Sequence, residues 1–275
     1  MMLNLLHKLG LPIATTAHGE SIYQLLGWVH WLMGVLFIGW MAFFVQVLWS
    51  FRAGKHPKAD YHGVKSHIST YAEVAVIVAE AILLLAFSIP MWSQRVHQFP
   101  SPLDSVVVEI TAEQFAWNIH YPGPDGVFGK SDPKLIDLQS NPLGLDFTDP
   151  HAQDDITNVN QMHLPVNKNA IIYLKSKDVI HCFNVPNFVI KQDVIPGQEI
   201  PIWFKPTLST EALRDKLGRP DYNYEIACAQ LCGNGHSSMK GYVTVESQDA
   251  FDVWLKSQAP KPVAKTESKD AGFWQ

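Results

Sequence analysis

Residues 21–51 read SIYQLLGWVHWLMGVLFIGWMAFFVQVLWSF and contain no Asp, Glu, Lys or Arg. A helix that crosses the hydrocarbon core of a bilayer needs about 20 mostly apolar residues, and this stretch is longer. A second apolar run, residues 74–92, is interrupted only by Glu80. Two such runs predict a transmembrane helical hairpin over residues 21–96, with helices at about 21–50 and 70–95, rather than two buried helices of a large soluble core.

The charges between and before these runs predict an orientation. The connecting loop, residues 52–67, carries four basic residues and one acidic residue. Loops rich in Lys and Arg stay in the cytoplasm, so both ends of the chain are expected outside a multi-pass inner-membrane protein. Residues 1–20 are then a short external segment. They make a poor signal peptide, because Lys8 is followed by a short apolar stretch with Pro12, although a cut near Ala17 stays open.

The composition changes at residue 97. From there the chain has 15 basic and 22 acidic residues, a net charge of −7, against −5 for all 275 residues. This acidity argues against a nucleic-acid partner. Three cysteines are too few for a disulfide scaffold. We expect an external, periplasmic domain over residues 97–258 and a flexible polar tail over residues 259–275.

Short apolar alternations recur between turn signals in this external domain. They lie at residues 105–110, 115–120, 170–174, 179–183, 200–204, 225–227 and 241–245. The pattern predicts an all-β domain, an antiparallel sandwich or barrel rather than a parallel α/β sheet. Residues 139–161 are loop-rich, and a connection of that length is expected to cover something or to have a function.

The densest chemistry lies at residues 228–239, which read CAQLCGNGHSSM. Thiolates and thioethers select copper, zinc or iron–sulfur centres, imidazole suits copper and zinc, and the thioether argues against zinc. A single blue-copper ion needs one Cys, two His and a distant Met. The second thiolate therefore suggests two sulfurs that bridge two copper ions, each capped by one His.

The second imidazole must come from elsewhere in the chain. His181 is the best candidate, on a predicted strand 47 residues before Cys228, so only the fold can bring the two together. Two alternatives stay open: a disulfide between Cys228 and Cys232, and Met239 as a core residue. Cys182 points to the opposite face of the strand from His181 and is interpreted as a buried small residue.

These motifs resemble subunit II of the haem–copper cytochrome c oxidases. The shared elements are C-x-[EQ]-x-C-G-x-x-H-x-x-M at 228–239, D-V-x-H at 178–181 and K-x-D-x-x-P-G at 191–197, and the likeness covers residues 19–254. The resemblance implies a cupredoxin-like barrel that holds the dinuclear copper A centre. By the same resemblance, the metal-binding residues are His181, Cys228, Gln230 through its backbone carbonyl, Cys232, His236 and Met239.

The resemblance also implies a function within a multisubunit oxidoreductase and proton translocase. The chain would accept electrons from a c-type cytochrome and pass them to haem in subunit I, which reduces oxygen to water. Subunit III, the lipid bilayer and a larger respiratory supercomplex are further expected partners. The acidic domain suits a basic donor, although its charge could serve solubility alone. No C-x-x-C-H occurs, so no haem c is fused to the chain.

Gln230, Phe115 and Glu73 bear on three further expectations: a magnesium site, electron entry and proton uptake. Many relatives have a Glu between the two cysteines that also helps to hold magnesium; Gln230 is a weaker ligand, so a magnesium site is doubtful. Phe115, in Gln114-Phe115-Ala116-Trp117, occupies the aromatic position where electrons are thought to enter, and Trp117 is a second candidate. Glu73 resembles a Glu near a proton-uptake entrance. It shares a helix face with Glu80, and a packing or interface role stays open for both.

Three other functions compete with this interpretation. A quinol oxidase subunit of similar shape typically lacks the copper ligands, whereas all six positions are filled here. A nitrous oxide reductase needs a large additional catalytic domain. A membrane-tethered copper chaperone or storage protein would use exposed, exchangeable ligands.

Overall fold

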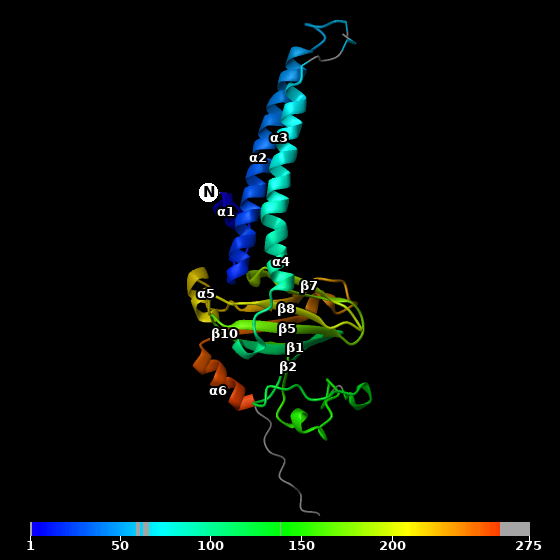
Figure 1. Cartoon of the computed structure of the whole chain (residues 1–275), viewed down its shortest axis with the longest axis vertical. Coiled ribbons are helices and arrows are strands. Elements are labelled where there is room, and N and C mark those ends of the chain that lie inside the picture. The colour runs from blue at the N-terminus through cyan, green and yellow to red at the C-terminus, as the bar shows by residue number, and fades with distance from the viewer. Residues whose placement is uncertain (1, 59–60, 63–65, 138, 259–275) are drawn as a thin grey trace, which may run out of the picture.

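Two long helices stand side by side on one end of a β domain (Figure 1). The computed structural model describes residues 2–58, 61–62, 66–137 and 139–258. The first long helix is α2 (Ala17–Ser50); the second consists of α3 (Ile68–Ile82), the π-helical turn η1 (Leu83–Ser88) and α4 (Ile89–His97). Their apolar windows have mean hydropathies of 2.0 and 2.4 and are not buried by the rest of the chain. Such exposed apolar surface fits a membrane-spanning hairpin.

The N-terminal residues are integrated into the structure. A short helix, α1 (Met2–Lys8), packs on α2, which begins at Ala17, before the predicted start at residue 21. The Thr16 hydroxyl accepts a hydrogen bond from the Gly19 backbone N–H at 3.3 Å, which explains this earlier start. Gly19, Tyr23 and Gly27, one stripe of α2, are buried.

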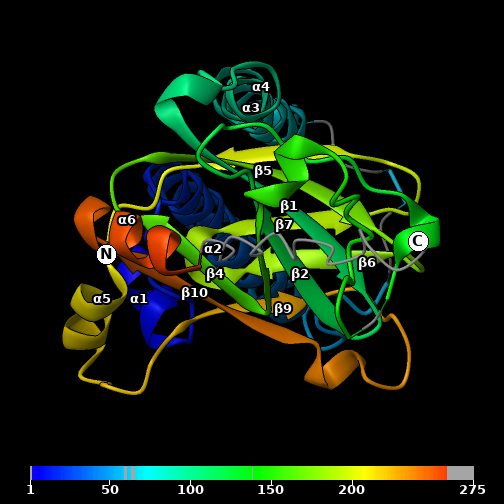
Figure 2. The ribbon, with the colours of Figure 1, turned by 90° about the horizontal axis from the view of Figure 1, so that it is seen from below.

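The β domain consists of two five-stranded sheets packed face to face (Figure 2). One sheet has the order β3-β2-β1-β5-β8 and the other β4-β10-β9-β6-β7. The strands are β1 (Ser105–Glu113), β2 (Ala116–Tyr121), β3 (Ile156–Val159), β4 (Gln161–Pro165), β5 (Asn169–Ser176), β6 (His181–Val185), β7 (Ile190–Val194), β8 (Ile200–Phe204), β9 (Tyr224–Cys228) and β10 (Lys240–Glu246). Fully buried side chains such as Trp117, Ile172 and Phe183 fill the space between the sheets. The sandwich is the all-β, cupredoxin-like architecture that was predicted.

The expectation of purely antiparallel pairing is wrong for two pairs of strands. β1 pairs in parallel with β5, and β10 pairs in parallel with β4. Each pair joins strands far apart in the sequence, so their direction depends on the path of the chain between the sheets, which local alternation does not encode.

Several elements escaped the sequence analysis. Strands β3 and β4 lie at the end of the loop-rich region, and β7 is a half-exposed strand whose sequence, IKQDV, alternates weakly. Two short helices, α5 (Thr210–Leu217) and α6 (Gln248–Gln258), flank the sheets. Short 3-10 turns complete the domain: η2 (Pro102–Asp104), η3 (Pro133–Leu135), η4 (Pro150–Gln153), η5 (Pro186–Phe188) and η6 (His236–Ser238).

The long connection between β2 and β3 covers one end of the first sheet through a buried charge cluster. Asp155 accepts a hydrogen bond from the Gly129 N–H at 2.8 Å, and its other contact is His120 Nε2, also at 2.8 Å. On the other side of the imidazole, His120 Nδ1 lies 4.0 Å from Glu109, which pairs with Lys175 at 2.6 Å. This cluster links the loop to β1, β2 and β5. The predicted flexible tail, residues 259–275, lies outside the described residues.

Candidate metal centre

The two thiols of residues 228–239 lie close together at one end of the second sheet. Cys228 is the last residue of β9, and the loop that follows carries Cys232 before the chain returns as β10. Their sulfur atoms are 3.8 Å apart and both thiols are free. A disulfide bond is about 2.05 Å long, so the two sulfurs are separate donors here.

An imidazole lies beside each sulfur. Strand β6 pairs antiparallel with β9, with Phe183 opposite Cys228, and this register brings His181 to the thiols from 47 residues away. His181 Nδ1 is 3.9 Å from Cys228 Sγ, and His236 Nδ1 is 3.5 Å from Cys232 Sγ. The structure therefore brings together the two thiols and the two imidazoles that the sequence singled out.

Two further donors complete the cluster. The Gln230 carbonyl oxygen is 3.1 Å from Cys228 Sγ, and Met239 Sδ is 3.8 Å from Cys232 Sγ. Three sulfurs, two imidazole nitrogens and one carbonyl form the donor set. Soft sulfur ligands combined with imidazole suit copper. The residues present therefore fit a copper centre.

Asp178 determines which nitrogen of His181 faces the sulfurs. Its carboxylate lies 2.8 Å from His181 Nε2 and accepts hydrogen bonds from the backbone N–H groups of Gln114 and Val179, each at 2.7 Å. Burial raises the pKa of the Asp178 carboxyl, but these hydrogen bonds outweigh it and hold the pKa below the usual value. With Nε2 engaged, Nδ1 is left for a metal. Asp178 belongs to the D-V-x-H motif, but the sequence analysis assigned it no role.

Four of the six donor residues are shielded from water, whereas His236 is half-buried and Gln230 is exposed. His181 and Met239 are 0% and 1% exposed, and Cys232 and Cys228 are 4% and 9% exposed. Burial, together with the neighbouring Cys228, raises the pKa of the Cys232 thiol to about 11. At neutral pH the Cys232 thiol therefore keeps its proton. A metal binds the thiolate form, so metal binding would release this proton.

Phe115 lies over the loop that carries Cys232 and His236. It is half-buried, and a Cβ built on Gly235 would lie only 2.4 Å from its ring. A Cβ built on Gly233, which has a φ of +135°, would lie 3.1 Å from the same ring. The neighbouring Gln114 amide donates a hydrogen bond to the Cys232 carbonyl at 2.5 Å. Phe115 is therefore half-buried against the loop that carries Cys232 and His236, and its role in electron entry stays a prediction.

The structure contradicts a surface role for Trp117. Its side chain is 0% exposed and packs behind the cluster, 6.2 Å from the His181 ring and 5.8 Å from the Phe183 ring. A soluble donor cannot contact it. Trp117 lies in the core between the sheets, where burial of its large ring stabilises the sandwich.

The intramembrane carboxylates and the third cysteine lie apart from the donors. Glu73 is exposed near the start of α3. Glu80 lines an otherwise mostly apolar cavity of about 310 Å³ between α2 and the second long helix, together with Ser88. Cys182 is 1% exposed, and within the described residues it does not belong to the metal-binding group formed by His181, Cys228 and Cys232.

A β sandwich with clustered sulfur and imidazole donors at one end, carried on two long apolar helices, defines a membrane-anchored protein with a cupredoxin-like domain. Residues 106–247 match the family model described as cytochrome C oxidase subunit II, periplasmic domain. A relative called alternative cytochrome c oxidase subunit 2, from Bradyrhizobium diazoefficiens, is 32% identical over 249 residues, which cover 90% of this chain and 83% of the relative.

The chain is also similar to a second relative and to a solved structure. Cytochrome c oxidase subunit 2 of Cereibacter sphaeroides is 26% identical over 256 residues, covering 83% of this chain and 75% of that protein. The crystal structure of the periplasmic domain of subunit II of cytochrome oxidase (CoxB) from Bradyrhizobium japonicum is 25% identical and covers 58% of this chain and 95% of that chain, with a TM-score of 0.39. On the family match and the 32% identical relative, the chain belongs to the cytochrome c oxidase subunit II family.

Proposed function

We propose that this chain is the electron-accepting subunit of a proton-pumping haem–copper terminal oxidase. It takes electrons from a c-type cytochrome at a dinuclear copper A centre and passes them to haem in subunit I, where oxygen is reduced to water. The observation that carries the proposal is the pair of sulfurs 3.8 Å apart with one imidazole beside each. A single-ion copper site would need only one of these thiols.

When bound, two copper ions that share both sulfurs would supply a one-electron couple whose charge is spread over two metals. The chain contributes rigidity. Strands β6 and β9 hold His181 and Cys228, and Asp178 orients His181. The surrounding core buries His181, Cys228, Cys232 and Met239. Ligands held in this way rearrange little when charge changes, which favours rapid electron transfer.

The burial of the donors bears on the alternatives. A copper chaperone or storage protein exchanges its metal and needs accessible ligands, whereas four donor side chains here are at most 9% exposed. A quinol oxidase subunit would not retain all six donors. A nitrous oxide reductase would join the copper domain to a second catalytic domain. We therefore favour the oxidase, in an inner membrane with the copper domain on the periplasmic side. Its partners are subunits I and III and, beyond them, a larger respiratory supercomplex.

Copper analysis and electron paramagnetic resonance of the full-length chain in detergent test the proposal. We expect about two copper ions per chain and a mixed-valence signal shared by both metals. Cys232→Ser should abolish that signal, whereas Cys182→Ser, which removes a buried thiol outside the cluster, should keep it. One copper ion per chain with a blue, single-ion spectrum would reject the dinuclear centre.

Glu73 is our candidate for proton uptake. It lies near the cytoplasmic end of its helix, where a carboxylate can collect protons, and intramembrane carboxylates usually serve such paths or pair with protein. In the assembled oxidase, Glu73→Gln should slow proton uptake without changing copper content. Glu80→Gln, on the same helix face, is the matched control. Uptake that is insensitive to Glu73→Gln would remove this role.

A further inference from the structure

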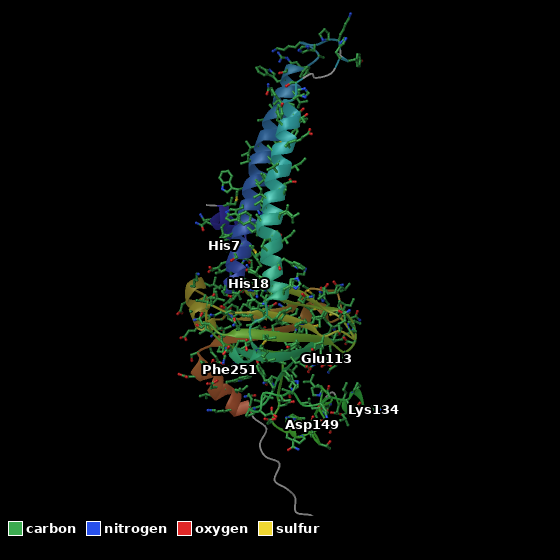
Figure 3. All side chains as sticks on the ribbon, in the orientation of Figure 1. His7, His18, Glu113, Lys134, Asp149 and Phe251 are labelled. Atoms are coloured by element: carbon green, nitrogen blue, oxygen red, sulfur yellow. The ribbon has the colours of Figure 1, made fainter. Side chains whose placement is uncertain are left out.

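A small cavity lies where the hairpin meets the β domain. It has a volume of about 280 Å³ and lies between α1, the first turns of α2 and α5. Figures 1 and 2 show α1 and α5 on the same side of the molecule, next to the base of α2, and Figure 3 shows His7 of α1 just beyond the sheets. None of the residues that line the cavity belongs to the sulfur cluster, and the proposed electron transfer does not use it.

The cavity lies at the expected edge of the bilayer. Glu20, which lines it, is the last charged residue before the charge-free residues 21–51. Tyr23 and Gln24, one turn further along α2, also line it. On α1 and just after it, Leu5 and Leu9 are 50% and 75% exposed, although they lie beside a membrane-spanning helix. Apolar side chains at this level are suited to contact with lipid.

The cavity is lined by one acidic and one basic side chain, and neither forms an ion pair within the described residues. Glu20 on α2 and Lys216 on α5 line the same space and are both exposed. In the part of the chain that the structure describes, neither forms an ion pair with the other or with a third residue. His7 adds an imidazole whose Nδ1 is 2.9 Å from the Leu11 carbonyl. An anion and a cation that face one cavity without pairing match a ligand that carries both charges.

We propose that this cavity binds the headgroup of a zwitterionic phospholipid of the phosphoethanolamine class. The primary ammonium would pair with Glu20 and the phosphate with Lys216, because charge-assisted hydrogen bonds are the strong ones. The volume lies near the lower limit of ligand pockets, about 300 Å³, and so suits a headgroup rather than a whole lipid. The acyl chains would lie against Leu5 and Leu9. The inference depends on the proposed membrane orientation, but not on copper.

The full-length chain in nanodiscs of equal parts phosphatidylethanolamine and phosphatidylglycerol provides the test. After gentle release, native mass spectrometry counts the lipids that stay bound to each chain. We expect one retained phosphatidylethanolamine in the native protein. Glu20→Gln should lower its retention at least about fivefold and remove the preference over phosphatidylglycerol, and Lys216→Gln should lower the retention of both lipids. Glu211→Gln and Lys134→Gln make the same charge changes on exposed residues outside the cavity and should have no effect.

Each outcome separates this inference from the proposed function. Equal retention of phosphatidylethanolamine in the native chain and in both cavity variants would overturn the lipid site, as would a native preference for phosphatidylglycerol. Full displacement by soluble glycerophosphoethanolamine would identify a free metabolite rather than a membrane lipid as the ligand, and would also overturn it. Failure of the chain to enter nanodiscs at all would instead contradict the membrane hairpin. Copper content serves as the folding control for every variant.

Discussion

Asp178 is the residue on which the orientation of His181 depends. Its carboxylate engages Nε2 at 2.8 Å, so Nδ1 points to Cys228 Sγ, 3.9 Å away. Outer-shell partners of this kind typically contribute 10–100-fold in metal affinity. We therefore expect Asp178→Asn to lower copper affinity by about 10–100-fold, measured by competition with a chelator of known affinity.

The matched control for Asp178→Asn is Asp221→Asn, which removes the same charge from an exposed side chain away from the sulfurs. It should bind copper as the native protein does. If Asp178→Asn also bound copper normally, the imidazole would be held by strand β6 alone and the carboxylate would have no orienting role.

At the scale of elements, residues 13–16 join the hairpin to the β domain. The Thr15 N–H donates to the Asn187 carbonyl at 2.8 Å, and the Thr207 N–H donates to the Thr15 carbonyl at 2.8 Å. The buried Thr16 hydroxyl donates to the Phe188 carbonyl at 2.8 Å while it caps α2. The segment that precedes the membrane helix is thus part of the sandwich, and a soluble fragment that begins after the hairpin would lack it.

Thr16→Val tests this junction. Valine has nearly the same shape but leaves the buried Phe188 carbonyl without its donor and α2 without its cap. Such losses cost about 1–3 kcal/mol. We expect the free energy of unfolding of the β domain to fall by about 2 kcal/mol, measured by denaturant titration of the full chain. Thr157→Val, at an exposed position on β3, should change it by less than about 0.5 kcal/mol.

The connection between β2 and β3 is held to the sheet by a buried charge cluster that titrates. Burial lowers the pKa of His120, but Asp155 and Glu109 outweigh it and raise the pKa above the ordinary 6.5. The folded protein therefore binds this proton more tightly than the unfolded chain. The resulting stability is fully present below about pH 6.5 and is lost as the pH rises through the raised pKa. The pKa of Glu109 shifts oppositely: burial raises it, but His120 and Lys175 lower it below 4.5, so its contribution is lost in acid.

We expect the copper-free protein to lose stability as the pH rises from about 6 to 9, and His120→Gln to flatten this decline. The measurement is the denaturation midpoint at each pH. Copper must be absent, because metal binding by thiols strengthens as the pH rises and has the opposite slope. An identical decline in His120→Gln would assign the pH dependence to other groups.

At the scale of the whole molecule, the proposed path for electrons runs from an aqueous surface to a buried centre. Uncharged side chains of the loop after β9 lie at the surface beside the cluster, since Leu231 is 77% exposed and Gln230 and Asn234 are also exposed. The domain as a whole is acidic, with a net charge of −7 from residue 97 onward. We therefore expect long-range charge to steer a basic donor and short-range contact at Phe115 and Leu231 to complete its docking.

Phe115→Ala should lower the rate of reduction by a basic c-type cytochrome about tenfold while copper content stays within error, because the ring covers the loop without holding a donor atom. Stopped-flow kinetics at several ionic strengths measure the effect. Raising the salt concentration should slow native and variant proteins alike, since the acidic surface is unchanged. Unchanged donor kinetics in Phe115→Ala would place the contact elsewhere.

The sequence by itself determined the features that depend on local chemistry. A charge-free run of residues 21–51 can be buried only in lipid or in a large core. In the external part, apolar and polar residues alternate along the strands, which requires sheets with one buried and one exposed face. The spacing of Cys228, Cys232, His236 and Met239 places three sulfur donors and one imidazole within twelve residues. These features predicted the hairpin, the sandwich and the candidate metal.

Only the tertiary structure decided the features that depend on residues far apart in the chain. It brought His181 to Cys228 through the register of β6 against β9, paired two sets of strands in parallel, and buried Trp117 behind the cluster. It also joined Thr16 to the sandwich and placed Lys216 and Glu20 in the lining of one cavity. The hydrophobic periodicity of a helix or strand shows which of its faces is apolar. Which other element packs against that face depends on how the long loops close and how the core packs.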